Sequence, residues 1–188
     1  MRTEYSRVRR HAGFTLIEVM VAILVLSVGL FGMAGMHARM LNGQFDAYQR
    51  AQAMLLTQDM VNRIRANPGP ARTGAYDNQE LGLAAAVCSE STNAHAAAND
   101  LACWSEALRG VSVSDDEGQQ FGSMIGARGC IDRISGTATS EVVLRVTVAW
   151  QGMTPTVAPS QACGANAYGA DNLRRAISID VALAYLGE

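Results

Sequence analysis

Glu18 is a carboxylate that lies close to the start of a long apolar segment. Between Phe14 and Met36 it is the only ionisable side chain. A charged side chain at the centre of a bilayer costs roughly 2.5–3.5 kcal/mol on insertion scales. A glutamate in this segment therefore needs a specific role, and pairing with a cation is the chemistry that its charge suggests.

Four cysteines form a second group of reactive side chains, and all lie outside the apolar segment: Cys88, Cys103, Cys130 and Cys163. An even number of cysteines in a chain with an export signal predicts two disulfides in an oxidising compartment. We expect Cys88 to pair with Cys103, closing a loop of about 15 residues worth roughly 3 kcal/mol of chain entropy. Pairing of Cys163 with Cys130 would tie a long loop to a strand, although the sequence leaves the other two connectivities open.

The sequence contains no pattern typical of an enzyme. A nucleophile elbow, a phosphate-binding loop and an HExxH zinc motif are all missing. Cys88, His95 and Cys103 lack the spacing of a zinc site, and the acidic turn at 115–117 lacks the alternating ligands of a calcium loop. We therefore expect no catalytic residues, no cofactor and no metal.

The basic charge of the chain is concentrated at the N-terminus. Residues 1–13 hold four arginines and one glutamate, so their removal changes the formal net charge from −2 to −5. A mildly acidic protein without a clustered basic face is a poor candidate for binding nucleic acid. The basic leader precedes an apolar run of about 23 residues, long enough to span a bilayer as a helix, and its arginines favour a cytoplasmic position for the leader.

Three interpretations of this N-terminus compete. A secretory signal cut after the apolar run would use the small residues Gly32 and Ala34, but the run exceeds the usual core of about 7–15 residues. A plain membrane anchor explains the length but not Glu18. A signal cut before the apolar run explains the leader, the length and the carboxylate together, and we favour it.

The segment Gly13-Phe14-Thr15-Leu16-Ile17-Glu18 closely resembles the N-terminal motif of type IV pilins and the related pseudopilins. The resemblance implies that a membrane-embedded prepilin peptidase cuts between Gly13 and Phe14 and N-methylates Phe14. It also implies that Glu18 pairs with the terminal amine of a neighbouring subunit and so fixes the axial register during assembly. A buried pair of this kind is weak evidence for stability but can specify register.

Helical patterning continues beyond the apolar segment and predicts one helix over residues 14–67. Pro68 disfavours helix at the preceding residue, and the helix would be roughly 80 Å long. A domain of about 120 residues cannot bury a helix of that length, so lipid or other subunits must cover residues 14–36. The predicted inward-facing stripe of the second half comprises Leu41, Phe45, Tyr48, Ala51, Leu55, Leu56, Met60 and Ile64.

Residues 68–188 predict a small α+β domain. Period-two alternation predicts strands at 142–150 and 176–185, each with one buried face, and weaker strand signals lie at 111–114 and 129–134. A short helix over 100–108, capped by Asn99 or Asp100, would direct Trp104 into the core, while 68–100 and 151–175 are expected to be irregular. The predicted fold is α+β and type IV pilin-like, with a leader at 1–13, a long helix at 14–67 packed on a small antiparallel β-sheet, and a periplasmic domain at 68–188.

Three further motifs lie in the stretch from Val28 to Arg39, at the helix end Arg65-Ala66-Asn67-Pro68, and at Asp100-Leu101 followed by Trp104 and Leu108. They resemble the corresponding motifs of minor pilins of the PilV family, which has glutamine where this chain has His37. The resemblance implies a subunit that joins other minor pilins and the major pilin, primes type IV pilus assembly and sits at the tip, supporting twitching motility and adhesion. It also implies a single-pass inner-membrane protein with a periplasmic domain before incorporation into the extracellular pilus. The alternatives are a minor pseudopilin of type II secretion and, from another class, a membrane-anchored periplasmic enzyme or binding protein.

Overall fold

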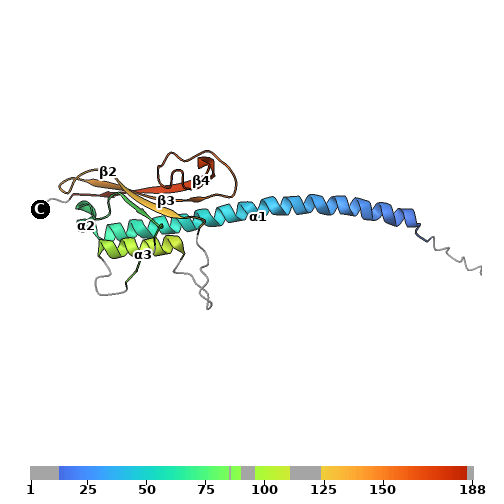
Figure 1. Ribbon diagram of the computed structural model, residues 1–188, viewed down its shortest axis with the longest axis horizontal. Helices are drawn as coiled ribbons and strands as arrows, with labels where there is room; N and C mark the ends of the chain where they lie inside the picture. The colour runs from blue at the N-terminus through green and yellow to red at the C-terminus, as the bar shows by residue number, and fades with distance from the viewer. Residues whose placement is uncertain (1–12, 85, 90–95, 111–123, 186–188) are drawn as a thin grey trace, which may run out of the picture. The chain divides into compact units, whose positions relative to one another are not determined.

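The computed structural model describes residues 13–84, 86–89, 96–110 and 124–185. The chain divides into two compact units, Met1–Gly43 and Gln44–Glu188. Helix α1 (Leu16–Ala66) runs through this boundary, so residues 44–66 of the helix belong to the globular unit. Figure 1 shows the sheet and helix α3 (Ala97–Arg109) packed along this part of α1. The long helix and the small antiparallel sheet confirm the predicted α+β fold class.

The face of α1 that is buried in the globular unit differs from the predicted stripe. Its buried side chains are Gln49, Ala53, Thr57, Met60, Val61 and Ile64. Met60 and Ile64 are therefore confirmed, and Leu56 is partly buried against the core. The prediction is wrong for five members of the stripe, which are exposed: Leu41, Phe45, Tyr48, Ala51 and Leu55. The small side chains Ala53 and Thr57 let the helix approach its neighbours closely, and the Thr57 hydroxyl is satisfied by donating to the Ala53 carbonyl at 2.7 Å.

The segment after α1 is more regular than predicted. Pro68 opens a short helix, α2 (Pro68–Arg72), because the fixed φ of proline suits the first turn of a helix. A strand, β1 (Gln79–Leu81), follows and pairs with β2 (Arg128–Ser135). The prediction of irregular structure over 68–100 is wrong for these two elements, because elements of five and three residues are too short to produce a periodic pattern. It is also wrong for residues 97–100, where α3 begins.

Within the described residues, four antiparallel strands form one sheet in the order β1-β2-β3-β4. The strands β3 (Val142–Gln151) and β4 (Arg174–Leu183) match the two predicted strands, although β4 lies two residues earlier than predicted. Every second residue of β3 from Val142 to Trp150 is buried, as the alternation predicts. Strand β2 confirms the weaker signal at 129–134, whereas the signal at 111–114 lies outside the described residues.

Trp104 joins α3 to both α1 and the sheet. Its indole is fully buried and its Nε1–H donates to the Leu56 carbonyl at 2.8 Å, which confirms the prediction that Trp104 is a core residue. Gly129 of β2 provides the space for the ring, because a Cβ at this position would lie 2.4 Å from the Cη2 atom of Trp104. A glycine in the strand therefore sets how closely α3 can pack on the sheet.

The outer face of the sheet is partly covered by the loop between β3 and β4, residues 152–173, which ends in a short 3-10 helix, η1 (Asp171–Leu173). Thr147 and Ala149 point to this face and are 1% and 0% exposed. The prediction of a single buried face is therefore wrong for this end of β3. Ala149 packs here against Cys130 and Cys163, which attach the loop to the sheet.

Candidate processing and assembly site

Thr15 caps the N-terminus of α1. The backbone N–H of Glu18 donates to the Thr15 carbonyl at 3.1 Å and lies 3.4 Å from the Thr15 hydroxyl oxygen. These contacts satisfy a donor that the first helical turn would otherwise leave unpaired. Thr15 and Glu18 have the spacing of a capping box. This spacing is visible in the sequence, but the prediction for Glu18 rests only on its charge and does not include the cap. The cap places the start of α1 at Leu16 and leaves Gly13 and Phe14 before the helix.

The three residues predicted for processing and assembly gather at this end of α1. Gly13, Phe14 and Glu18 are all exposed, Phe14 by 83%. Glu18 lies in the first helical turn, where the positive end of the helix dipole favours a carboxylate. Within the described part of the chain, the Glu18 carboxylate takes part in none of the ion pairs. It can therefore accept a cation from another molecule.

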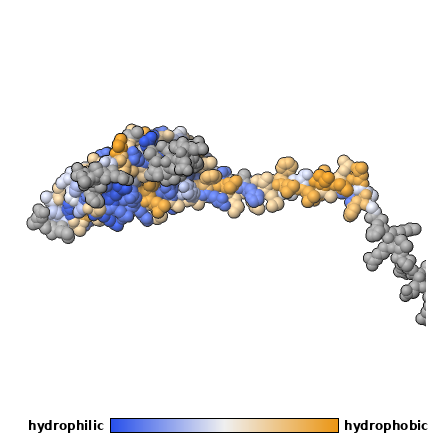
Figure 2. All heavy atoms as spheres, turned by 90° about the horizontal axis from the view of Figure 1, so that it is seen from below, coloured by the Kyte–Doolittle hydropathy of each residue, from blue (hydrophilic) through white to orange (hydrophobic). Residues whose placement is uncertain are grey.

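An uncovered apolar surface follows. From Phe14 to Met36, every large apolar side chain is about half or more exposed, and Figure 2 shows these apolar residues along the N-terminal part of α1. By length and composition, α1 is the one helix among the described residues that could cross a membrane. The helix continues without a break through Gly29, Gly32 and Gly35. A surface of this kind requires lipid or other helices to cover it.

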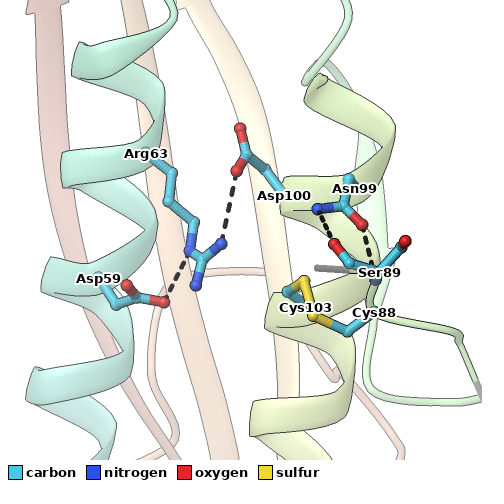
Figure 3. The surroundings of a disulfide bond; sticks show 7 residues. All are labelled: Asp59, Arg63, Cys88, Ser89, Asn99, Asp100 and Cys103. Atoms are coloured by element: carbon cyan, nitrogen blue, oxygen red, sulfur yellow. Dashed lines mark hydrogen bonds and ion pairs between the residues drawn. A yellow bond between two sulfur atoms is a disulfide. The ribbon is translucent and has the colours of Figure 1, made fainter. Parts of the chain in front are cut away.

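In the globular unit, the Cys88–Cys103 disulfide attaches the segment 86–89 to α3 (Figure 3). Asn99 and Ser89 reinforce this attachment with two hydrogen bonds beside it. The Asn99 amide donates to the Ser89 carbonyl at 3.0 Å, and the Ser89 N–H donates to Asn99 Oδ1 at 2.9 Å. Because α3 begins at Ala97, Asn99 lies inside the first turn, and its prediction as a cap is wrong.

Asp100, the other predicted cap, is instead a buried acceptor that joins three segments and is 3% exposed. Its carboxylate accepts hydrogen bonds from the Tyr76 hydroxyl at 2.6 Å and the Asn67 amide at 2.8 Å. Arg63 of α1 lies between Asp100 and Asp59, at 3.4 Å and 2.9 Å (Figure 3). Burial, and then the hydrogen bond to Asp100, raise the pKa of Tyr76, so this hydroxyl remains a neutral donor at neutral pH.

The Cys130–Cys163 disulfide ties the 152–173 loop to β2. The two disulfides have the expected pairing and use all of the cysteines. Arg174, which no sequence pattern marks, holds the same loop: its buried guanidinium donates to the Cys163 carbonyl at 3.0 Å and pairs with Asp171 at 2.7 Å. The hydrogen bond between them raises the pKa of Arg174 and lowers the pKa of Asp171, so the pair stays charged at neutral pH.

Residues 8–34 match the family model described as the prokaryotic N-terminal methylation motif. This match supports a type IV pilin-like protein. The matched residues include Gly13, Phe14 and Glu18, and the motif indicates a pilin or pseudopilin, a structural protein rather than an enzyme. It is consistent with processing by a prepilin peptidase, and together with the apolar helix it fits an inner-membrane-anchored pilin.

Comparisons of the pilin-like chain with curated proteins and with solved structures found no match. Across the described residues, no group of three or more histidine, cysteine, aspartate or glutamate side chains is placed to hold a metal ion.

Proposed function

We propose that the chain is a minor pilin that primes the assembly of a type IV pilus. The observation that supports this most strongly is the uncovered apolar segment at 14–36, which begins inside the matched methylation motif and carries Glu18 in its first turn. The resemblance of Val28–Arg39 and of the helix end to PilV-family proteins favours a minor pilin over a major one.

Processing at the N-terminus comes first. Prepilin peptidase cuts between Gly13 and Phe14 and N-methylates Phe14, which releases the leader at 1–13. In the mature chain, residues 14–36, which include the start of α1, lie in the inner membrane, and residues 68–188 form a periplasmic domain. The disulfides suit this location, because disulfides persist in oxidising compartments such as the periplasm.

Assembly then covers the apolar helix. The subunit joins other minor pilins and the major pilin through residues 14–36, and the complex forms the tip of the pilus, where it supports twitching motility and adhesion. Glu18 pairs with the Phe14 amine of a neighbouring subunit. Water is excluded from a bundle of apolar helices, so an unpaired charge there is costly and a paired one is strongly attracted. The axial register that pairs both groups is therefore favoured over all others.

Mass spectrometry of the purified mature protein tests the processing step. The expected N-terminus is N-methylated Phe14. An intact Met1, or a cut after the apolar run near Gly35, would overturn the proposal, since it would leave Glu18 without the terminal amine it requires.

Substitution of Glu18 tests the assembly step. Glu18→Ala and Glu18→Val should insert into the membrane normally but disappear from sheared pili, as followed by immunoblots of membrane and pilus fractions. Glu18→Asp retains the carboxylate and is the matched control, with incorporation expected to exceed that of Glu18→Ala. Normal incorporation of the alanine and valine variants would contradict the role of Glu18 in register.

Deletion of the gene distinguishes a role in a pilus from a role in type II secretion, which the N-terminal motif does not distinguish because it indicates a pilin or a pseudopilin. A minor pilin predicts loss of surface pili and of twitching, with release of exoproteins unchanged. Loss of exoprotein release with normal piliation would instead identify a minor pseudopilin.

A further inference from the structure

A cavity of about 370 Å³ in the globular unit is lined by residues of α1, β3 and β4. Trp150 of β3 and Arg175 of β4, which are cross-strand partners, line it together with Asp46 and Arg50 of α1. Two guanidinium groups and one carboxylate thus face the same space. The lining carries one net positive charge in a chain whose formal net charge is negative.

Arg175 is held in place by backbone atoms and not by a carboxylate. Its guanidinium donates to the carbonyls of Thr154 at 2.5 Å, Asn172 at 3.3 Å and Arg174 at 3.4 Å. Gly152 leaves room for it, because a Cβ there would lie 2.7 Å from Arg175 Cζ. Among the ion pairs of the described residues, none involves Arg175 or Arg50. The cavity therefore has a positioned cation whose charge is not neutralised.

Trp150 adds an unused hydrogen-bond donor. The side chain is 4% exposed, and its Nε1–H is buried without an acceptor in the described chain. The other tryptophan, Trp104, differs because its Nε1–H donates to the Leu56 carbonyl. Buried donors in native proteins almost always have a partner, so this indole differs from that of Trp104, and because Trp150 lines the cavity its signal can report what binds there.

We propose that this cavity binds the carboxylate of an acidic side chain in a peptide segment of a partner protein. Arg50 and Arg175 supply the positive charge and donate hydrogen bonds to the carboxylate oxygens, and the Trp150 ring lines the space beside them. Asp46 limits the net charge of the lining to a single positive charge, which suits a carboxylate better than a doubly charged phosphate. The volume exceeds what a carboxylate alone fills and leaves room for an aspartate or glutamate side chain with its backbone. The site depends on the globular unit alone and not on cleavage at Gly13.

The indole N–H signals of the isotope-labelled full-length chain in detergent provide the test, because the chain has two tryptophans. The probes are a short blocked peptide with one central glutamate, the same peptide with glutamine, and acetate. We expect the glutamate peptide to move the Trp150 signal, assigned through Trp150→Phe, with a Kd on the order of 1 mM or lower. The Trp104 signal should stay in place, and the glutamine peptide and acetate should bind at least about tenfold more weakly.

Matched arginine variants identify the groups that bind. Arg50→Gln and Arg175→Gln should each weaken binding of the glutamate peptide by about tenfold. Arg145→Gln removes an arginine of β3 that is paired with Asp180 outside the cavity, and it should not change the affinity. An unchanged Trp104 signal shows that each variant is folded. The proposal is overturned if Trp150 does not respond at about 10 mM peptide, if the glutamine peptide or acetate binds as well, or if Arg145→Gln weakens binding as much as Arg175→Gln.

Discussion

Replacing Arg174 with methionine should release the 152–173 loop from the sheet. Arg174 is 3% exposed and lies at the first position of β4. Its guanidinium donates to the carbonyls of Pro159 at 3.1 Å, Cys163 at 3.0 Å and Gln161, and makes two hydrogen bonds to Asp171 at 2.7 Å and 2.9 Å. Methionine retains most of the apolar contact area of the side chain but provides no donor.

The three carbonyls determine the size of the effect. Each loses a hydrogen bond worth about 1 kcal/mol net, so the free energy of unfolding should fall by about 3 kcal/mol. Asp171 adds little, because its side chain is 35% exposed and can be hydrated once its partner is gone. With a urea dependence of about 2 kcal/mol per molar, the unfolding midpoint should decrease by about 1.5 M urea.

The assay is equilibrium urea unfolding of the full-length protein in mild detergent under non-reducing conditions, so that the Cys130–Cys163 disulfide stays intact in both states. Arg145→Met is the matched control. Arg145 also makes two hydrogen bonds to a carboxylate, Asp180, at 2.7 Å and 2.8 Å, but both side chains are more than a third exposed. The control should therefore unfold close to the unaltered protein. Equal shifts for the two variants, or a shift below about 0.5 M urea for Arg174→Met, would refute the reasoning.

Three further predictions concern packing, the disulfide and pH. Gly129→Ala should lower the free energy of unfolding by about 3 kcal/mol, because the new Cβ overlaps the buried indole of Trp104. Gly69→Ala is the control: its new Cβ meets open space, so the free energy of unfolding should change by no more than about 0.5 kcal/mol in the same assay. Replacing Cys130 and Cys163 with serine should cost about 4 kcal/mol for a sequence separation of 33 residues, and reductant should then shift the midpoint less than in the unaltered protein. The hydrogen bond from Arg145 lowers the pKa of Asp180 from its ordinary value. The contribution of Asp180 to stability is therefore present above the unfolded-state pKa and is lost as the pH falls through the lower folded-state pKa. Urea midpoints measured from about pH 6 to about pH 2 should fall less steeply in Asp180→Asn, and an unchanged acid dependence would contradict this assignment.

Strong periodic patterns predict the largest elements of this fold correctly. The alternation along β3 is regular because one face of that strand is buried at every second residue, and the length of α1 follows from a run that no proline interrupts before Pro68. The buried face of α1 could not be predicted in the same way. Which side chains of an amphipathic helix turn inward depends on where the sheet lies, and here Ala53 and Thr57 are buried while Phe45 and Tyr48 are exposed.

The candidate sites also differ in whether local sequence or tertiary packing defines them. Gly13, Phe14 and Glu18 are close together in the sequence, so their spacing alone suggests a role. Asp100 is of a residue type that commonly caps helices, but its hydrogen bond from the Tyr76 hydroxyl makes it a buried acceptor. The cavity lined by Trp150 combines residues of α1 with residues of the sheet that lie about 100 positions or more later along the chain. Only the folded structure brings these two groups together.

The order of the strands along the chain also has a kinetic consequence. Each strand pairs with its neighbour in the sequential order β1-β2-β3-β4. The core that buries Met60 and Ile64 of α1, however, also includes Val142 and Leu144 of β3, which lie roughly 80 residues later along the chain. Because closure of long loops slows folding, we expect docking of α1 to be late and the helix to remain vulnerable to aggregation until β3 arrives. The two disulfides should then form in a fixed order. Cys88 and Cys103 can meet as soon as α3 exists, whereas Cys130 and Cys163 must wait until the loop after β3 has been made.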